Sequence, residues 1–336
     1  FLDGPTQEFC SIISDWHVRG EAREITEEVW DFAKKHGFLG LRVSKEAGGH
    51  GFSAQAQSII LGTVASRSLD ASVTVEVPNS LGPDELLEEC GTPEQKEKYL
   101  KALVSGEEIA CFAITSPTAG SDAASMRDVG YVGYKKIKGK ETLGITVTWS
   151  KRYITLAPKA TVMALAFHLF DPENHLGKEE DCGITLALIP TNHPGVEIGR
   201  RHLPGGSVFP NGPTWGNEVF IPLDWVVGGK EGVGQGWKMV MQCLAAGRGI
   251  SLPSMSAAAT KLMLRTSSAY ARVRRQFNKP IGNIEGIQEP LARLAGNAYV
   301  MDAASNLTVA GIDLGEKPSV ISAIVKYHCT HRGQRS

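Results

Sequence analysis

The residues best suited to chemistry follow a short apolar segment before the middle of the chain, in the sequence Phe-Ala-Ile-Thr-Ser-Pro-Thr-Ala-Gly-Ser-Asp at 112–122. The segment reads as the end of a strand that presents hydroxyl groups and free backbone N–H groups to a polar ligand. Gly120 has no side chain, so a ligand can approach the backbone closely there. Taken alone, the segment is better explained as a polar turn that binds nothing.

A second segment, Lys-Arg-Tyr-Ile-Thr-Leu at 151–156, also ends a predicted strand with an aromatic residue and a hydroxyl group. If the two strands pair, their ends lie side by side. The residues that would offer an apolar wall are Phe112, Ile114 and Tyr153, and those that would offer hydrogen bonds are Thr115 and Thr155. An isoalloxazine ring needs such a wall and a few hydrogen bonds at its polar edge. The alternative is a β-turn whose polar groups are satisfied within the protein.

Two basic clusters are candidates for anion binding. Arg-Val-Arg-Arg-Gln-Phe at 272–277 ends a predicted helix, and an arginine there can bind a pyrophosphate bidentately. Spacing alone favours the other interpretation, solvated charge placed favourably at a helix C-terminus. Arg-Arg-His at 200–202 is a similar cluster, and we predict that it lies on the surface.

Other kinds of site find little support in the sequence. His328 and His331 lie three residues apart on one predicted helix face, but no further ligand is evident nearby, so we expect no metal site. The glycine-rich stretch at 232–236 lacks the strand–turn–helix surroundings of a dinucleotide fingerprint or phosphate loop. No Ser/His/Asp order points to a nucleophile, and basic residues are not interleaved with aromatic runs as in nucleic-acid-binding proteins.

Composition narrows the class of protein. The 336 residues suffice for two or three domains. The 35 Lys and Arg residues balance 36 Asp and Glu residues, so no overall field favours nucleic acid or a membrane surface. The longest apolar run, at 160–170, is too short to span a bilayer. Six scattered cysteines without a Cys-x-x-Cys pair predict free thiols in a reducing compartment.

Periodicity divides the chain into three parts, in the order helix, strand, helix. Short runs rich in Val, Ile, Thr and aromatic residues occur only in the middle part, separated by turn residues. These runs are 145–149, 161–170, 183–190 and 218–221. We therefore predict an α+β multidomain fold with a helical N-terminal domain, a central β domain and a helical C-terminal domain. The predicted limits are 1–110, 111–227 and 228–336.

Several helix ends carry clear signals. Thr92 is a predicted N-cap, because it is followed by Pro at the first helical position and Gln at the third. Ser53 is a second predicted cap, and Gly37 is predicted to end the helix before it. In the C-terminal part, a long helix is predicted from Trp237 to about Phe277.

Taken together, these segments resemble the acyl-coenzyme A (acyl-CoA) dehydrogenase family over essentially the whole chain. The two strand ends look like the segments that cradle the flavin in that family. A narrower resemblance, to the long FadE-type bacterial enzymes of fatty-acid β-oxidation, rests on 77–82, 151–158, 195–202, 289–293 and 295–302. The family fold has a helical, a β and a second helical domain, which agrees with the order read from periodicity.

The resemblance implies FAD as cofactor and assigns roles to particular residues. By resemblance, the residues that line FAD are Phe112, Ile114, Thr115, Gly120, Ser121, Tyr153 and Thr155. Those that reach the FAD of a neighbouring subunit are Arg274, Gln276 and Phe277, so a homo-oligomer is expected. Ser121 and Arg248 are implied to lie at the acyl-CoA.

In the chemistry of the family, a carboxylate removes the α proton of the thioester and the β hydrogen leaves as hydride to flavin N5. The α proton is weakly acidic, so the site must stabilise enolate-like charge. The family places its base either in a later loop or one residue before the matching arginine. The matching arginine here is Arg248, so the earlier position is occupied by Gly247. Glycine cannot accept a proton. We therefore expect the base beyond Ser336, in a chain that looks like a fragment, and expect these 336 residues alone to be inactive.

The resemblance also implies partners and leaves alternatives open. It implies a fatty acyl-CoA substrate, an electron-transferring flavoprotein as acceptor, no nucleic acid, and a cytoplasmic location. The longer relatives carry an apolar N-terminal segment, so association with the inner membrane stays open. One alternative is an acyl-CoA oxidase on the same fold, which would release hydrogen peroxide. Another is a non-catalytic acyl-CoA-binding relative that lacks the base.

Overall fold

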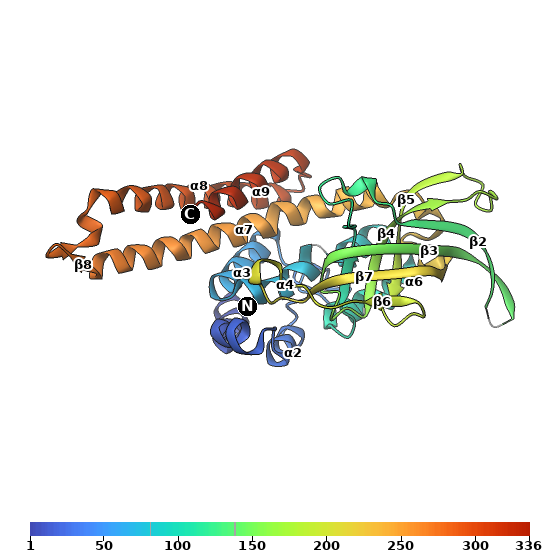
Figure 1. Cartoon of the computed structure of the whole chain (residues 1–336), viewed down its shortest axis with the longest axis horizontal. Coiled ribbons are helices and arrows are strands. Elements are labelled where there is room, and N and C mark those ends of the chain that lie inside the picture. Colours follow the sequence, from blue (N-terminus) through green and yellow to red (C-terminus); the bar gives the residue numbers. More distant parts are fainter. Residues whose placement is uncertain (81, 138) are drawn as a thin grey trace. The chain divides into compact units, whose positions relative to one another are not determined.

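A computed structural model describes residues 1–80, 82–137 and 139–336, without the side chains of 244–246. Figure 1 shows helices at both ends of the sequence and strands between them. Backbone contacts divide the chain into two compact units. Unit 1 comprises Phe1–Asp15, Phe52–Ser72 and Leu244–Ser336, and unit 2 comprises Trp16–Gly51 and Val73–Cys243. The helix–strand–helix order confirms the predicted fold class, while the predicted limits at 110 and 227 stay a prediction.

The N-terminal part is helical, as predicted. Its α-helices are α1 (Gln7–Ile12), α2 (Glu27–Lys35), α3 (Ala54–Arg67), α4 (Leu69–Ser80), α5 (Pro83–Cys90) and α6 (Pro93–Ser105), with π-helical turns at Leu2–Thr6 and His17–Ala22. Thr92 and Gln95 form the predicted capping box of α6, and the Ser53 hydroxyl accepts from the backbone of Ala56 at the start of α3. Gly37, at φ 72°, follows the end of α2 in the left-handed conformation expected there.

The middle part forms one mixed sheet in unit 2. Its strands are β1 (Ala110–Ala113), β2 (Val129–Ile137), β3 (Lys140–Thr155), β4 (Val162–Phe170), β5 (Asp181–Pro190), β6 (Val196–Ile198) and β7 (Asn211–Pro222). The four predicted runs correspond to β3, β4, β5 and β7, and only Thr161 falls outside its strand. β4 and β5 are the best-buried strands, because nearly every side chain between Val162 and Leu169 is enclosed by protein.

The pairing of β4 determines where the other strands end. β5 is antiparallel to β4 along the whole strand, from Val162 to Phe170. β1 is parallel to the first part of β4, and β2 is parallel to its last part, opposite His168. Because one edge of β4 is taken by β5, β1 and β2 share the other edge, one after the other. β3 then pairs with β2, so the chain leaves β1 at a point close to β3.

The C-terminal part of unit 1 is helical. It contains α7 (Gly236–Val273), which starts in unit 2, α8 (Glu285–Asp313) and α9 (Ser319–Gln334). A small apolar core of Ala257, Met301, Val325 and Cys329 joins these three helices. Figure 1 shows α8 running back along α7, after which α9 reverses direction, so that Arg332 near the end of α9 donates to Asn297 of α8 at 2.9 Å. Among the described residues, no helix combines the length and apolar character needed to cross a bilayer.

One predicted helix end is wrong. α7 stops at Val273 rather than near Phe277, and residues 274–277 are not a helix end. Instead β8 (Arg275–Gln276) pairs with β9 (Lys279–Pro280) in a tight hairpin. Phe277 and Asn278 both have positive φ, 52° and 59°, as the two central residues of a type I′ turn require. Asparagine tolerates this conformation well, and the turn preference overrides the helical pattern.

Candidate functional site

The two predicted strand ends meet in unit 2, although not in the way that the sequence suggested. β1 pairs with β4 and not with β3. The contact forms just beyond β1, where the backbone N–H of Arg152 donates to the carbonyl oxygen of Thr115 at 3.0 Å. The turn after β1 and the last residues of β3 are therefore held together by a backbone hydrogen bond.

The end of β3 is irregular at the predicted aromatic position. The pairing of β3 with β7 shifts register between Lys151 and Ile154, as in a β-bulge. Tyr153 lies in this irregularity with φ 59°, which is uncommon for a residue with a side chain, and its side chain is 52% exposed. The Arg152 guanidinium and the His202 ring lie 4.9 Å from the Tyr153 ring. The bulge thus turns an aromatic ring out to solvent beside two cationic or titratable groups.

Asn211, the first residue of β7, fixes the polar groups at the end of β3. Its side-chain N–H groups donate to the carbonyl oxygen of Tyr153 at 3.1 Å and to the Thr155 hydroxyl at 3.2 Å. A hydroxyl oxygen that accepts a hydrogen bond keeps its own proton for another acceptor. The Thr155 hydroxyl therefore keeps its proton available for donation.

The turn after β1 lies beside this end of β3. Phe112, Ile114 and Thr115 are half-buried. Ser116 and Ala119 exchange two backbone hydrogen bonds of 3.2 Å, which close the turn. After this turn, Gly120 and Ser121 are exposed, and a side chain at Gly120 would meet no atom within 4 Å.

The residue types at these strand ends are those that a flavin site uses. Tyr153 and Ile114 provide apolar surface, the Thr155 hydroxyl provides a donor, and open space at Gly120 leaves its backbone accessible. Phe112 and Thr115 stand beside them on the segment that leads out of β1. The chain's own residues thus supply the kinds of group that an isoalloxazine ring and its ribityl chain need.

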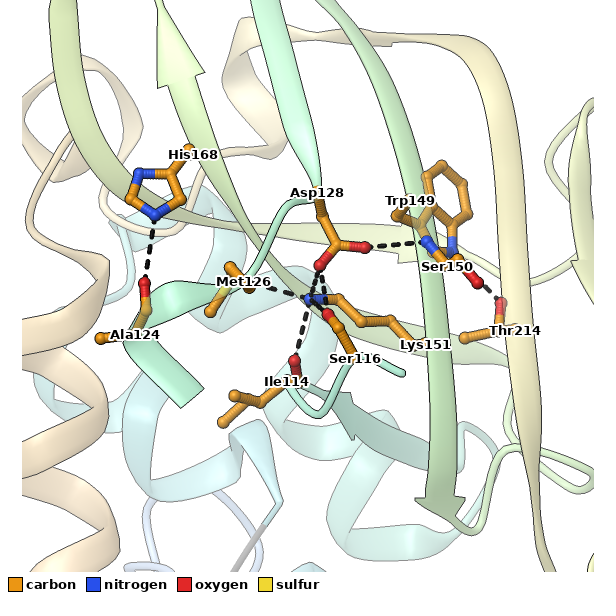
Figure 2. Close-up of polar contacts among 10 residues, drawn as sticks. All are labelled: Ile114, Ser116, Ala124, Met126, Asp128, Trp149, Ser150, Lys151, His168 and Thr214. Atoms are coloured by element: carbon orange, nitrogen blue, oxygen red, sulfur yellow. Dashed lines mark hydrogen bonds and ion pairs between the residues drawn. The ribbon is translucent and has the colours of Figure 1, made fainter. Parts of the chain in front are cut away.

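A buried charged cluster lies under these strand ends (Figure 2). The Lys151 ammonium contacts the Asp128 carboxylate at 2.6 Å, the Ile114 carbonyl oxygen at 2.9 Å and the Ser116 hydroxyl at 3.2 Å. Lys151 and Asp128 are 1% and 4% exposed. Burial lowers the pKa of Lys151, and the carboxylate of Asp128 opposes this effect by favouring the ammonium.

The remaining predicted residues belong to unit 1. Arg248 is half-buried on α7, while Arg274, Gln276 and Phe277 are exposed at the β8–β9 hairpin. The flavin segments belong to unit 2, so the meeting of the two groups in one site stays a prediction. Gly247 is buried on α7 and offers no proton acceptor.

Sequence reasoning missed several residues of the site. His202 was predicted to lie on the surface with its basic neighbours, but it is half-buried against Tyr153. Asn211, Asp128 and the contacts of the Lys151 ammonium were also missed. The burial of Lys151 could have been predicted from the sequence. Val147 and Trp149 precede it at spacings of two, which places all three side chains on the inward face of β3. A buried ammonium is stabilised by a nearby carboxylate, because it has lost its contact with water. Asp128, directly before the paired strand β2, provides that carboxylate.

The histidines of α9 have another environment. His328 and His331 line a pocket with Arg293, Arg332 and Arg335. Within the described residues, no group of three or more His, Cys, Asp or Glu side chains is arranged to hold a metal ion.

Three family models match the chain. They are described as acyl-CoA dehydrogenase N-terminal, middle and C-terminal domains, and they cover residues 6–107, 111–210 and 234–336. The three matches leave few residues of the chain outside them.

Two relatives that match nearly the whole chain are also described as acyl-CoA dehydrogenases. The human very long-chain specific acyl-CoA dehydrogenase is 30% identical over 96% of the chain and 47% of its own length. The probable acyl-CoA dehydrogenase FadE10 of Mycobacterium tuberculosis is 27% identical over 96% of the chain and 45% of its own length. A shorter match, Protein HemX of Proteus mirabilis, is 52% identical over 29% of the chain and 56% of its own length. The chain spans about half the length of the curated relatives it matches.

Solved structures share the fold. The butyryl-CoA dehydrogenase of Megasphaera elsdenii is similar with a TM-score of 0.83 at 22% identity, over 98% of this chain and 83% of that one. An FAD complex of PigA is similar with a TM-score of 0.81 at 22% identity, over 98% and 82% of the two chains.

Proposed function

Because the chain belongs to the acyl-CoA dehydrogenase family, we propose that it takes part in the FAD-dependent α,β-dehydrogenation of an acyl-CoA thioester. The cofactor of this family is FAD, which, when bound, accepts the β hydrogen of the substrate as hydride. The observation that carries the proposal is the meeting of the Thr115 and Arg152 backbones, beside which Tyr153 and Thr155 present a ring and a hydroxyl.

Each residue at the strand ends has a definite task in this proposal. The Tyr153 ring and Ile114 cover a planar ligand and exclude water from it. The Thr155 hydroxyl, held by Asn211, donates to a polar edge of the ligand. Exposed Ser121 and the accessible backbone at Gly120 face the solvent side, where a long substrate enters. We propose no base among the described residues, because Gly247 cannot accept a proton.

The substrate class is a fatty acyl-CoA. The matches to the very long-chain enzyme and to FadE10 support this choice, while the butyryl-CoA enzyme shows that the fold also serves short chains. We propose an electron-transferring flavoprotein as acceptor. A likeness in fold to the electron transferring flavoprotein of Acidaminococcus fermentans, with a TM-score of 0.83 at 21% identity, supports this acceptor.

We also propose that the chain works as a homo-oligomer. Phe277 is 87% exposed at the β8–β9 hairpin, beside Arg274 and Gln276. A large exposed aromatic ring on a tight turn is a suitable group to enter a site on a second subunit.

A binding experiment tests this function without depending on a catalytic base. The protein is loaded with FAD, and octanoyl-CoA or palmitoyl-CoA is titrated while the flavin absorption spectrum is recorded. We expect a saturable spectral change with both thioesters and a lower dissociation constant for palmitoyl-CoA. Palmitate without CoA is the control and should give no such change. A flavin spectrum that ignores both thioesters would contradict the proposal.

A further inference from the structure

The buried pair of Lys151 and Asp128 lies where the two flavin segments are joined. Asp128 immediately precedes β2, and its two carboxylate oxygens have different partners. Oδ1 accepts from the backbone N–H of Ser150 at 2.8 Å. Oδ2 accepts from the Lys151 ammonium and from the Ser116 hydroxyl. One carboxylate thus connects the turn after β1 with two successive residues of β3.

The Lys151 ammonium makes the reciprocal connection. Its three N–H donors have candidate acceptors in the Ile114 carbonyl oxygen, the Ser116 hydroxyl and Asp128, and the Met126 sulfur lies at 3.6 Å (Figure 2). The alkyl chain comes from β3, while two of these acceptors come from the turn after β1. Lys151 of β3 is therefore bonded to the turn after β1, and Asp128 is bonded to both the turn and β3.

Such a pair is a poor device for stability alone. Removing two charges from water costs several kcal/mol per ion, and well-packed apolar residues often replace a buried pair without loss of stability. Its advantage is geometric, because an ammonium with three directed hydrogen bonds defines one position for the groups around it. The groups fixed here are Ile114 and Ser116, on either side of Thr115, whose carbonyl oxygen accepts from Arg152.

We propose that Lys151 and Asp128 are positioning residues for the flavin: they hold the Ile114–Ser116 turn against the end of β3, so that Thr115 and Ile114 face Tyr153 and Thr155 at the separation the flavin requires. This inference rests on the proposed function. Neither residue touches the ligand. Alternation along β3 directs Lys151 inward, and the bulge that follows it directs Tyr153 outward, so the buried anchor directly precedes the exposed ring.

The pair is tested by removing both charges together. A single Lys151→Met change leaves a buried carboxylate without its cation and is expected to destabilise the fold strongly. The double variant Lys151→Met/Asp128→Asn leaves no net charge, and the amide oxygen that replaces the carboxylate still accepts from the backbone of Ser150. The matched control is Lys159→Met, which breaks the exposed ion pair with Glu27 in the same unit.

Two measurements are made on the full chain. The first is the FAD dissociation constant from quenching of flavin fluorescence. The second is amide hydrogen exchange of Arg152 without FAD, since this N–H makes the backbone bond to Thr115. We expect the double variant to bind FAD at least tenfold more weakly and to exchange the Arg152 amide at least tenfold faster. The amides of β4 should keep their exchange rates, and Lys159→Met should match the wild type.

The outcomes are distinguishable. If the double variant binds FAD as tightly as the wild type, the pair is structural only and the inference is wrong. If the wild type itself binds no FAD, the proposed function fails and the inference falls with it. If the double variant does not fold by its thermal transition, Ser116→Ala, which removes one hydroxyl of the cluster and no charge, is measured in the same way. Unchanged FAD affinity and unchanged Arg152 exchange in that variant would overturn the inference.

Discussion

Replacing Glu76 by glutamine should remove a pH-dependent loss of stability. Glu76 lies on α4 in unit 2 and is 5% exposed, and its Oε1 has no hydrogen-bond partner among the described residues. Burial raises the pKa of this carboxyl from 4.5 to about 7, because the charged form is poorly solvated there. Glutamine has the shape of the protonated acid and does not ionise.

The sign and size of the effect follow from linkage. Below pH 4.5, the carboxyl is protonated in both the folded and the unfolded chain. Between pH 4.5 and about 7, the folded chain keeps the proton that the unfolded chain releases, so the free energy of unfolding falls as pH rises. One pKa unit corresponds to about 1.4 kcal/mol, so the total loss is roughly 3 kcal/mol above pH 7.

The assay is urea unfolding at pH values from 4.5 to 8, on the wild type, Glu76→Gln and the exposed control Glu97→Gln. Glu76→Gln should equal the wild type near pH 4.5 and be roughly 3 kcal/mol more stable at pH 8. Burial also raises the pKa of Asp84, to about 8. Asp84 therefore lowers the free energy of unfolding with rising pH equally in the wild type and in Glu76→Gln, and the difference between these two proteins reports on Glu76 alone. A difference that stays constant with pH, or a stabilised Glu97→Gln, would refute the reasoning.

Three further predictions concern single residues. Thr155→Val should weaken FAD binding by roughly 1–3 kcal/mol, because a polar edge of the ligand loses its donor. Fluorescence titration measures the FAD dissociation constant, and an unchanged value would place the ligand elsewhere. Thr92→Ala should lower the free energy of unfolding by about 1 kcal/mol, since the Gln95 N–H loses its capping acceptor; urea unfolding checks this, and no loss would mean that the cap is redundant. Cys111 should resist thiol reagents in the native protein, because burial raises its pKa to about 12. Mass spectrometry after brief alkylation at pH 8 should find Cys111 unmodified, and rapid labelling would contradict its burial.

Residues with strong local signals were predicted well from the sequence. The capping box at Thr92 depends only on four neighbouring residues, so it survives any tertiary arrangement. The apolar runs of β4 and β5 follow from burial on both faces of the sheet. The segments 112–116 and 151–155 were recognised through their resemblance to the flavin segments of the family, because the residues alone are better explained as polar turns.

Features that depend on distant partners were not predicted. β2 has glycines at 130 and 133 and lysines at 135 and 136, which weaken its strand signal. Gly130 is needed because a β-carbon there would lie 2.7 Å from the Phe167 ring, a contact that local sequence does not reveal. In the same way, the helix end at Val273 depends on a hairpin turn at Phe277 and Asn278. The two predicted segments meet, while their use as a flavin site stays a prediction, and their contacts with Asp128 and Asn211 come from residues far away in the sequence.

The central claim is that the turn after β1 and the end of β3 together hold FAD. The most direct test is to mix the protein with excess FAD, remove the free flavin by gel filtration, and measure the flavin retained per chain from the absorption spectrum. We predict about one flavin per chain for the wild type and Lys159→Met, and a clearly lower content for Thr155→Val. A wild-type protein that emerges colourless, while its far-UV circular dichroism shows that it is folded, would contradict the claim.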